Sequence, residues 1–125
     1  MPEQQFRVVA GSVTCTATLA SNATARAIWV GLPLEARANR WGDELYFSVS
    51  VDAPADPGAQ AEVRVGDVAF WPPGNAICIF WGPTPASVGS EPRAASPVSV
   101  FAHIADGAVD LGATPSGTLV RLEPV

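Results

Sequence analysis

The stretch VTCTATL at residues 13–19 alternates hydrophobic and polar side chains without a break. A period of two is typical of a β-strand that turns one face to a core and the other to solvent. The same alternation returns in LYFSVSV at residues 45–51 and in VSVFAHI at residues 98–104. Because helical periodicity is rare in the rest of the chain, the sequence predicts a mainly β protein.

Turn-forming residues divide the chain into further short strands. PPGN at residues 72–75 is a strong turn signal between two apolar strands, at residues 68–71 and 76–81. About seven or eight short strands joined by turns predict a barrel or a sandwich. Two stretches rich in Pro and Gly, residues 52–61 and 82–97, are expected to be loops, and the longer one is a candidate binding loop.

One segment predicts a helix instead of a strand. Asn22 is a suitable N-cap, residues 23–30 are rich in Ala and lack Gly and Pro, and Pro33 cannot continue a helix. We expect a helix of about two turns that covers the open end of a barrel. The hydrophobic residues expected to share its buried face are Ala23, Ala27, Ile28 and Val30.

Composition favours one folded domain over residues 1–125, because 48% of the residues are hydrophobic and only 15% are charged. Seven arginines, twelve acids and no lysine give a formal net charge of −5. No basic cluster occurs, which excludes nucleic acid and anionic membrane surfaces as expected partners. No apolar run is long enough to span a bilayer, so we expect a soluble cytoplasmic protein.

Surface hydrophobicity bears on self-association. The mean hydropathy is +0.22, and four tryptophans must be placed in a small body. We therefore expect a modest exposed apolar patch, through which the chain could form a homodimer.

The cysteine and histidine content argues against metal and disulfide chemistry. Cys15 and Cys78 lie far apart, each within an apolar, strand-like run, and are expected to be buried free thiols. His103 is the sole histidine, which is more typical of a strand residue than of a catalytic base. We expect no metal site and no cofactor.

Five motifs occur in an order that resembles a known family: LASNATARAIWVGLPL at 19–34, WGDELYF at 41–47, GDVAFWPPG at 66–74, ICIFWGPTP at 77–85 and PVSVF at 97–101. Together they resemble the small cyclophilin-like proteins of bacteria and archaea, over about residues 13–104. The resemblance implies a closed eight-stranded barrel capped by one helix, with a groove on one side. It implies no established biochemical activity.

The true cyclophilins are peptidyl-prolyl isomerases, and most of the residues that form their isomerase site have no counterpart here. Their catalytic arginine follows Phe-His on a strand that corresponds to residues 41–47, where this chain has no arginine and Arg40 lies just before. The segment CIFW at residues 78–81 is similar to their Gln-Phe-Phe-Ile, so an aromatic floor survives in Phe80 or Trp81. We therefore assign no catalytic residue.

Several polar and aromatic residues are candidates for the groove. An arginine could donate to a carbonyl or carboxylate there, although a solvated loop arginine is the more ordinary interpretation. Asp43, Glu44 and Asp67 are interpreted as turn residues rather than as an acid–base set. The residues predicted to border the site are Tyr46, Phe80, Trp81, Arg93 and Arg40.

These observations favour a non-catalytic binding module for a peptide or a small metabolite. An alternative is a prolyl isomerase with a substituted active site, in which Arg40 or Arg93 weakens the amide resonance of a Pro-containing peptide. A further alternative, which rests on the resemblance alone, is a subunit or scaffold of a metabolic enzyme complex.

Overall fold

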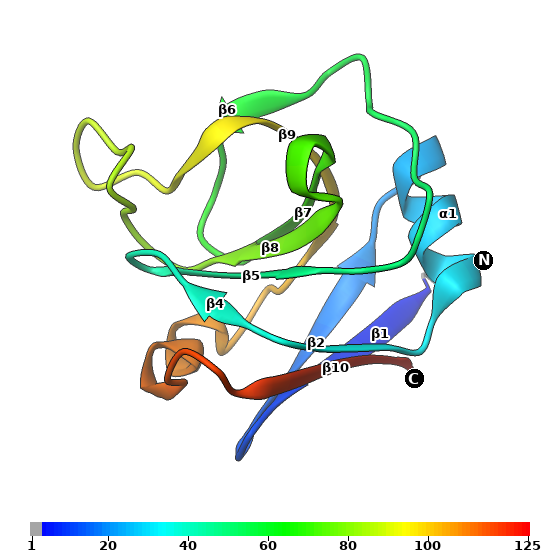
Figure 1. Cartoon of the computed structure of the whole chain (residues 1–125), viewed down its shortest axis with the longest axis horizontal. Coiled ribbons are helices and arrows are strands. Elements are labelled where there is room, and N and C mark those ends of the chain that lie inside the picture. The colour runs from blue at the N-terminus through cyan, green and yellow to red at the C-terminus, as the bar shows by residue number, and fades with distance from the viewer. Residues whose placement is uncertain (1–3) are drawn as a thin grey trace.

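The computed structural model describes residues 4–125, and it is mainly β as predicted (Figure 1). The strands in these residues are β1 (Gln5–Ala10), β2 (Val13–Leu19), β3 (Leu34–Arg37), β4 (Asn39–Arg40), β5 (Glu44–Ser48), β6 (Gln60–Glu62), β7 (Asp67–Trp71), β8 (Ala76–Phe80), β9 (Arg93–His103) and β10 (Leu119–Pro124). Helix α1 spans Ala23–Gly31, and short 3-10 turns span Pro72–Gly74 and Ala108–Ala113.

The strands form one antiparallel sheet in the order β3-β10-β1-β2-β9-β7-β8-β5-β4, with β6 paired to β9 beside this path. The predicted closed barrel is not supported, because the sheet formed by residues 4–125 ends at β3 and β4 and no ladder joins these two strands. The end strands β3 and β4 are consecutive in the chain, separated only by Ala38. Ala38 still donates its N–H to the carbonyl of Thr118 next to β10, and after it the chain pairs with β5 instead. This change of partner interrupts the ladder.

Alternate residues of the sheet fill the main hydrophobic core. The alternation predicted at residues 45–51 is confirmed in β5, where Leu45 and Phe47 are fully buried in that core. Phe6 of β1 and Phe101 of β9 stack there with ring centroids 6.2 Å apart. Burying a side chain of this size contributes about 2–3 kcal/mol of hydrophobic free energy, so the core is the main source of stability.

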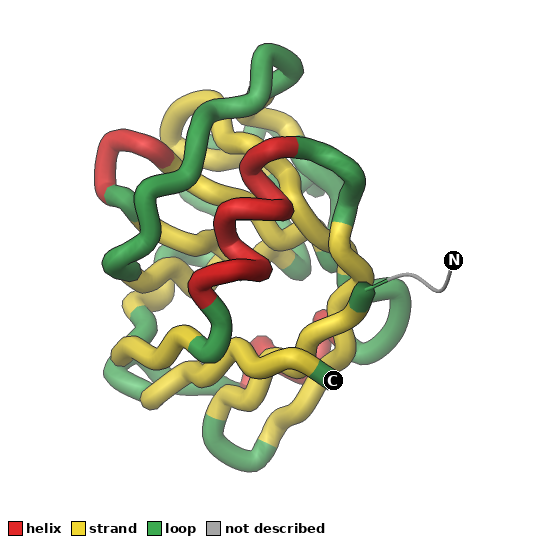
Figure 2. Tube along the Cα trace, turned by 90° about the vertical axis from the view of Figure 1, so that its right-hand side faces the viewer, coloured by secondary structure: helices red, strands yellow, loops and turns green. Residues whose placement is uncertain are grey.

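Helix α1 lies across one end of the space that the sheet surrounds (Figure 2). Its predicted N-cap is confirmed, since Asn22 Oδ1 accepts the N–H of Ala25 at 2.8 Å. The predicted face is wrong at both ends: Ala23 is exposed and Val30 is 84% exposed. Thr24 faces inward instead, and its hydroxyl donates to the carbonyl of Pro54. Its buried residues are Thr24, Ala25 and Ile28.

The turns confirm one prediction and correct another. Residues 72–75 form the expected turn, with Asn75 in the left-handed region at φ 47°. The loop predicted at residues 82–97 is shorter, because β9 begins at Arg93 and includes Pro97. A proline within a strand is tolerated there because the β6–β9 register is irregular and β7 pairs with β9 only from Ser99 onward.

Candidate functional site

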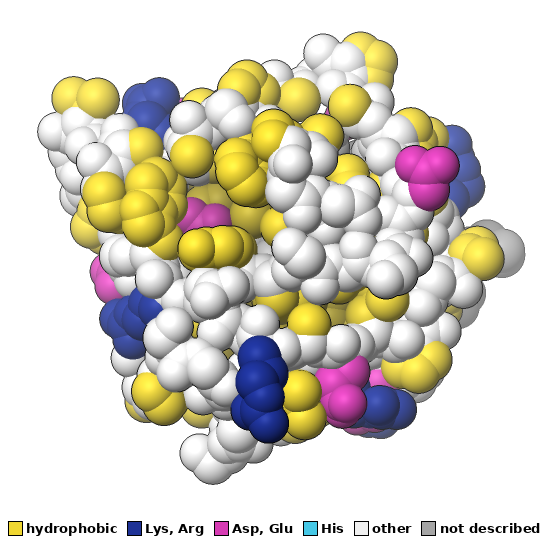
Figure 3. Space-filling model, viewed as in Figure 1, with side chains coloured by type: hydrophobic (Ala, Val, Ile, Leu, Met, Phe, Trp, Pro, Cys, Tyr) yellow, Lys and Arg dark blue, Asp and Glu magenta, His cyan; other side chains and the backbone are white. Residues whose placement is uncertain are grey.

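A cavity of about 160 Å³ opens on the outer face of β5 and β8. In the space-filling view, hydrophobic side chains gather around a hollow on this face (Figure 3). A cavity of about 150 Å³ is known to accommodate benzene, so this one suits a group of roughly that size. Its lining residues are Trp41, Glu44, Tyr46, Trp71, Cys78, Ala94 and Ala95.

Strand register brings the lining together. Glu44 and Tyr46 are two apart in β5 and therefore point to the same face, and Tyr46 is paired directly with Cys78 of β8. Ala69 of β7 is paired with Cys78 as well, which places Trp71 on this face two residues later. The intervening residues of the same strands face the main core. A second hydrophobic cluster results on the outer face, formed by Val63, Ala69, Cys78, Phe80, Ala94 and Val98, with Tyr46, Trp71 and Val100 packed against it.

Three aromatic side chains, Trp41, Tyr46 and Trp71, form walls of the cavity. Trp71 is held in place by a hydrogen bond from its indole Nε1 to Ser96 Oγ, at 2.7 Å. Its ring also lies over Gly74, where an added Cβ would come within 2.7 Å of it. The aromatic wall at Trp71 is therefore fixed before any ligand arrives, which lowers the entropic cost of binding.

Glu44 supplies the acidic group of the cavity. Its side chain belongs to a residue that is only 4% exposed, and Oε1 has no hydrogen-bond partner among residues 4–125. Burial raises the pKa of Glu44 to about 7, and the interaction with the Cys78 thiol opposes this rise. Burial and the nearby Glu44 raise the pKa of Cys78 well above its ordinary value. The thiol is therefore protonated at neutral pH and is a poor nucleophile.

Of the five predicted groove residues, Tyr46 lines the cavity. Phe80 and Trp81 point to opposite sides: Phe80 belongs to the second cluster beneath the cavity and Trp81 to the main core. Arg40 lies over the Trp81 ring, 5.3 Å from its centroid. Its guanidinium donates to the carbonyls of Gly42 at 3.0 Å and Gly112 at 2.6 Å. Arg40 thus fastens loops together outside the cavity lining.

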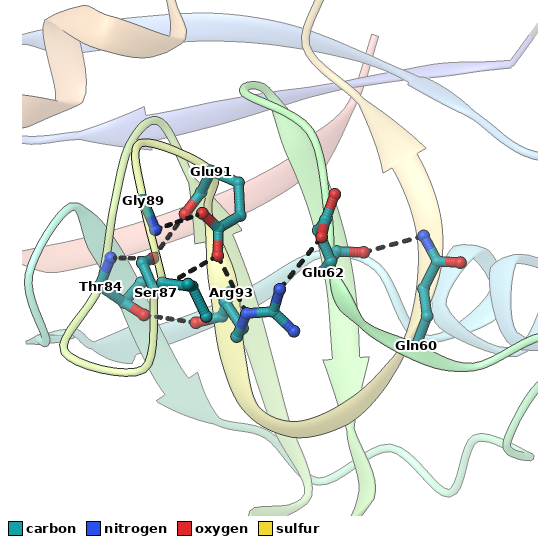
Figure 4. Close-up of polar contacts among 8 residues, drawn as sticks. Gln60, Glu62, Thr84, Ser87, Gly89, Glu91 and Arg93 are labelled. Atoms are coloured by element: carbon teal, nitrogen blue, oxygen red, sulfur yellow. Dashed lines mark hydrogen bonds and ion pairs between the residues drawn. The ribbon is translucent and has the colours of Figure 1, made fainter.

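Arg93 is held in a polar network at the base of the loop before β9 (Figure 4). Its Nε donates to Glu91 at 3.0 Å and its Nη2 to Glu62 at 3.1 Å. Glu91 also accepts the backbone N–H groups of Val88 and Gly89, which with Arg93 lower the pKa of its carboxyl to about 2. Arg93 therefore organises the loop and does not line the cavity.

The sequence interpretation missed most of the lining. Glu44 was expected in a turn with Asp43, but it begins β5, paired with Phe80. Its spacing of two from Tyr46 is a signal that could have placed both on one face. The contact with Cys78 depends on how β5 pairs with β8, which spacing within one strand does not reveal. Trp41 lies between β4 and β5, Trp71 ends β7, and Ala94 and Ala95 lie near the start of β9.

The remaining polar groups lie elsewhere. Asp67 forms the predicted turn, accepting the N–H of Arg64 at 2.9 Å, and it also contacts His103 Nδ1 at 2.9 Å.

Cys15 and Cys78 are buried and free, as predicted. Within residues 4–125, no three His, Cys, Asp or Glu side chains lie close enough to share a metal ion. The helices in that range are too short or too polar to cross a membrane.

Comparisons with known proteins agree with the motifs. The family model described as cyclophilin-like matches residues 4–123. The solution structure of the hypothetical protein AF2241 from Archaeoglobus fulgidus is 37% identical in sequence, with a TM-score of 0.82. The match covers 98% of this chain and 95% of that one. No curated protein matches the chain.

Proposed function

The chain belongs to the cyclophilin-like family, and from this premise we propose that it is a non-catalytic module that binds a small metabolite, or one side chain of a peptide, in the cavity over β5 and β8. One observation carries the proposal: aromatic walls surround a buried carboxyl whose Oε1 has no partner among the described residues. Small-molecule sites combine an apolar lining with a few such polar groups. An unsatisfied buried oxygen costs about 1–3 kcal/mol, which a donor on a ligand would offset.

The titratable groups that line the cavity support binding more than catalysis. Its titratable residues are Glu44, Tyr46 and Cys78. A nucleophilic role for Cys78 would need a thiolate, and the raised pKa of this thiol opposes that state. The raised pKa of Glu44 suits a general acid or base, but the lining offers it no activated nucleophile to work with, since Cys78 is a protonated thiol.

The isomerase alternative has weaker support. It requires a donor beside the amide of the bound proline, and the two candidate arginines are engaged elsewhere. Arg40 donates to Gly42 and Gly112, and Arg93 donates to Glu62 and Glu91. We also propose a single domain in the cytoplasm, since two buried free thiols suit a reducing compartment.

Nuclear magnetic resonance offers a direct test, because the tryptophans provide both reporters and internal controls. Fragments of about benzene size should shift the indole signals of Trp41 and Trp71, which line the cavity, and leave that of Trp81 in the main core unchanged. Ala95→Phe should fill the cavity and abolish the shifts. Ala105→Phe, at an exposed alanine outside the lining, is the matched control. If no fragment moves either reporter, the proposal is wrong.

A further inference from the structure

The cavity has a negative group without a positive partner. Glu44 is the only charged side chain among the seven lining residues, and it is buried. A carboxylate removed from water is costly unless it is paired and hydrogen-bonded. Its Oε1 has neither kind of partner among residues 4–125. What the site lacks is therefore a positive charge that carries an N–H donor.

The neighbouring arginines do not supply it. Arg40, on the strand paired with β5, donates to the backbone carbonyls of Gly42, Gly112 and Thr114 and to Asp43 at 3.4 Å. Arg93, next to the lining residue Ala94, is divided between Glu62 and Glu91. Both guanidinium groups are held by other acceptors, so Glu44 is left to a group from outside the chain.

The aromatic walls favour the same kind of ligand. The faces of Trp and Tyr rings carry partial negative charge and attract ammonium groups, and two tryptophans and one tyrosine line this cavity. An anionic ligand would meet the buried carboxyl and these same ring faces. A quaternary ammonium would satisfy the rings, but it has no N–H to give to Glu44 Oε1.

We infer that the ligand carries a protonated amine, whose N–H donates to Glu44 Oε1 and whose carbons pack on Trp41, Tyr46 and Trp71. This inference rests on the proposed binding function. The volume of about 160 Å³ limits the apolar part to roughly a six-membered ring or a short alkyl chain. Two sources share this chemistry, a free amine metabolite and the lysine side chain of a peptide.

A matched pair of probes tests the inference. Piperidine hydrochloride and tetrahydropyran are rings of the same size, one cationic with N–H donors and one neutral without them. Both are titrated at about pH 8, where Glu44 with a pKa of about 7 is mostly ionised, and the Trp41 and Trp71 indole signals are followed. We expect wild-type protein to bind piperidinium at least about tenfold more tightly than tetrahydropyran, as an added charge-assisted hydrogen bond implies.

Two variants assign that preference to one carboxyl. Glu44→Gln keeps the shape of the side chain and removes its charge, so the preference for piperidinium should fall to the smaller part that the aromatic faces supply. Glu35→Gln removes an exposed carboxylate on β3, outside the cavity lining, and should keep the wild-type preference. Urea unfolding of each variant shows that it is folded. A Glu44→Gln protein that keeps the full wild-type preference for piperidinium would overturn the inference.

The outcomes separate this inference from the proposed function. If neutral rings shift the Trp41 and Trp71 signals as strongly as piperidinium does, the cavity binds small molecules but the amine preference is wrong. If no probe or fragment shifts either signal, both proposals fail. A peptide with one lysine, compared with the same peptide carrying norleucine, distinguishes the sources. Glu44-dependent binding of the lysine peptide indicates a side chain, whereas binding of free amines alone indicates a metabolite.

Discussion

Replacing Glu44 with glutamine should make the stability of the protein less sensitive to pH. Burial raises the pKa of Glu44 from an ordinary 4.5 to about 7, so the fold favours the protonated carboxyl. Between these values the folded chain binds more protons than the unfolded chain, and the free energy of unfolding therefore falls as pH rises through this window. Glutamine resembles the protonated acid and does not titrate, so the variant lacks this loss.

The two pKa values also give the size of the effect. Each tenfold difference in proton affinity corresponds to about 1.4 kcal/mol, so keeping Glu44 ionised costs the folded protein about 3 kcal/mol above pH 7. About 1 kcal/mol of this is already lost at about pH 5.5, a convenient lower limit because it lies above the isoelectric point near 4.6. The remaining cost of ionising Glu44, about 2 kcal/mol, develops between about pH 5.5 and 8.5.

Urea unfolding of both proteins at about pH 5.5 and 8.5 measures this difference. Relative to wild type, Glu44→Gln should gain about 2 kcal/mol of unfolding free energy over that interval. The control Glu35→Gln alters an exposed carboxylate whose nearest ion pair, with Arg121, spans 3.8 Å, and should show no comparable gain. A Glu44→Gln advantage that is the same at both pH values would refute the reasoning, because it would mean that the buried carboxyl keeps an ordinary pKa.

Three further predictions follow from other contacts. Asn75→Ala should lower the free energy of unfolding in urea by about 2–3 kcal/mol, because it removes side-chain hydrogen bonds to the Val49 and Val51 carbonyls and leaves alanine at φ 47°. Asn75→Gly should lower it by less, since glycine adopts this φ without strain. Equal losses in the two variants would show that φ is unimportant. In Arg93→Ala, the carboxyl pKa of Glu91 measured by NMR should rise from about 2 but stay below 4.5, since the Val88 and Gly89 donors remain; an ordinary value would show that Arg93 alone sets it. The homodimer stays a prediction, and light scattering that gives 12.9 kDa at high protein concentration would contradict it.

Local sequence patterns predicted the helices and strands better than they predicted which of these elements pack or pair with one another. The faces of β5 follow from alternation alone, and the start of α1 follows from Asn22, because both depend on neighbours in the sequence. The buried face of α1 could not be predicted in this way, since the Thr24 hydroxyl is bonded to the distant Pro54 carbonyl. The interruption of the sheet at Ala38 likewise depends on which strands lie on either side.

The candidate site was harder to predict for the same reason. Tyr46 was predicted to border the site, and it lines the cavity. Glu44 was interpreted as a turn residue, because an acid next to Gly-Asp is usually exposed. Only the pairing of β5 with β8 reveals that this acid lies beside Cys78 in a buried environment.

Strands β5, β7 and β8 separate two hydrophobic clusters, and this arrangement affects the accuracy of folding. A slip of one residue in a strand exchanges its two faces. In β5 such a slip would carry Glu44 into the main core and bring Leu45 out of it. In the native cavity this carboxyl has the Cys78 thiol as a partner, whereas a core of phenylalanines offers no donor. The slip would therefore cost further free energy at Glu44 and would also expose Leu45. The acid of the cavity thus also acts against misfolding, and it would have this effect whether or not a ligand is present.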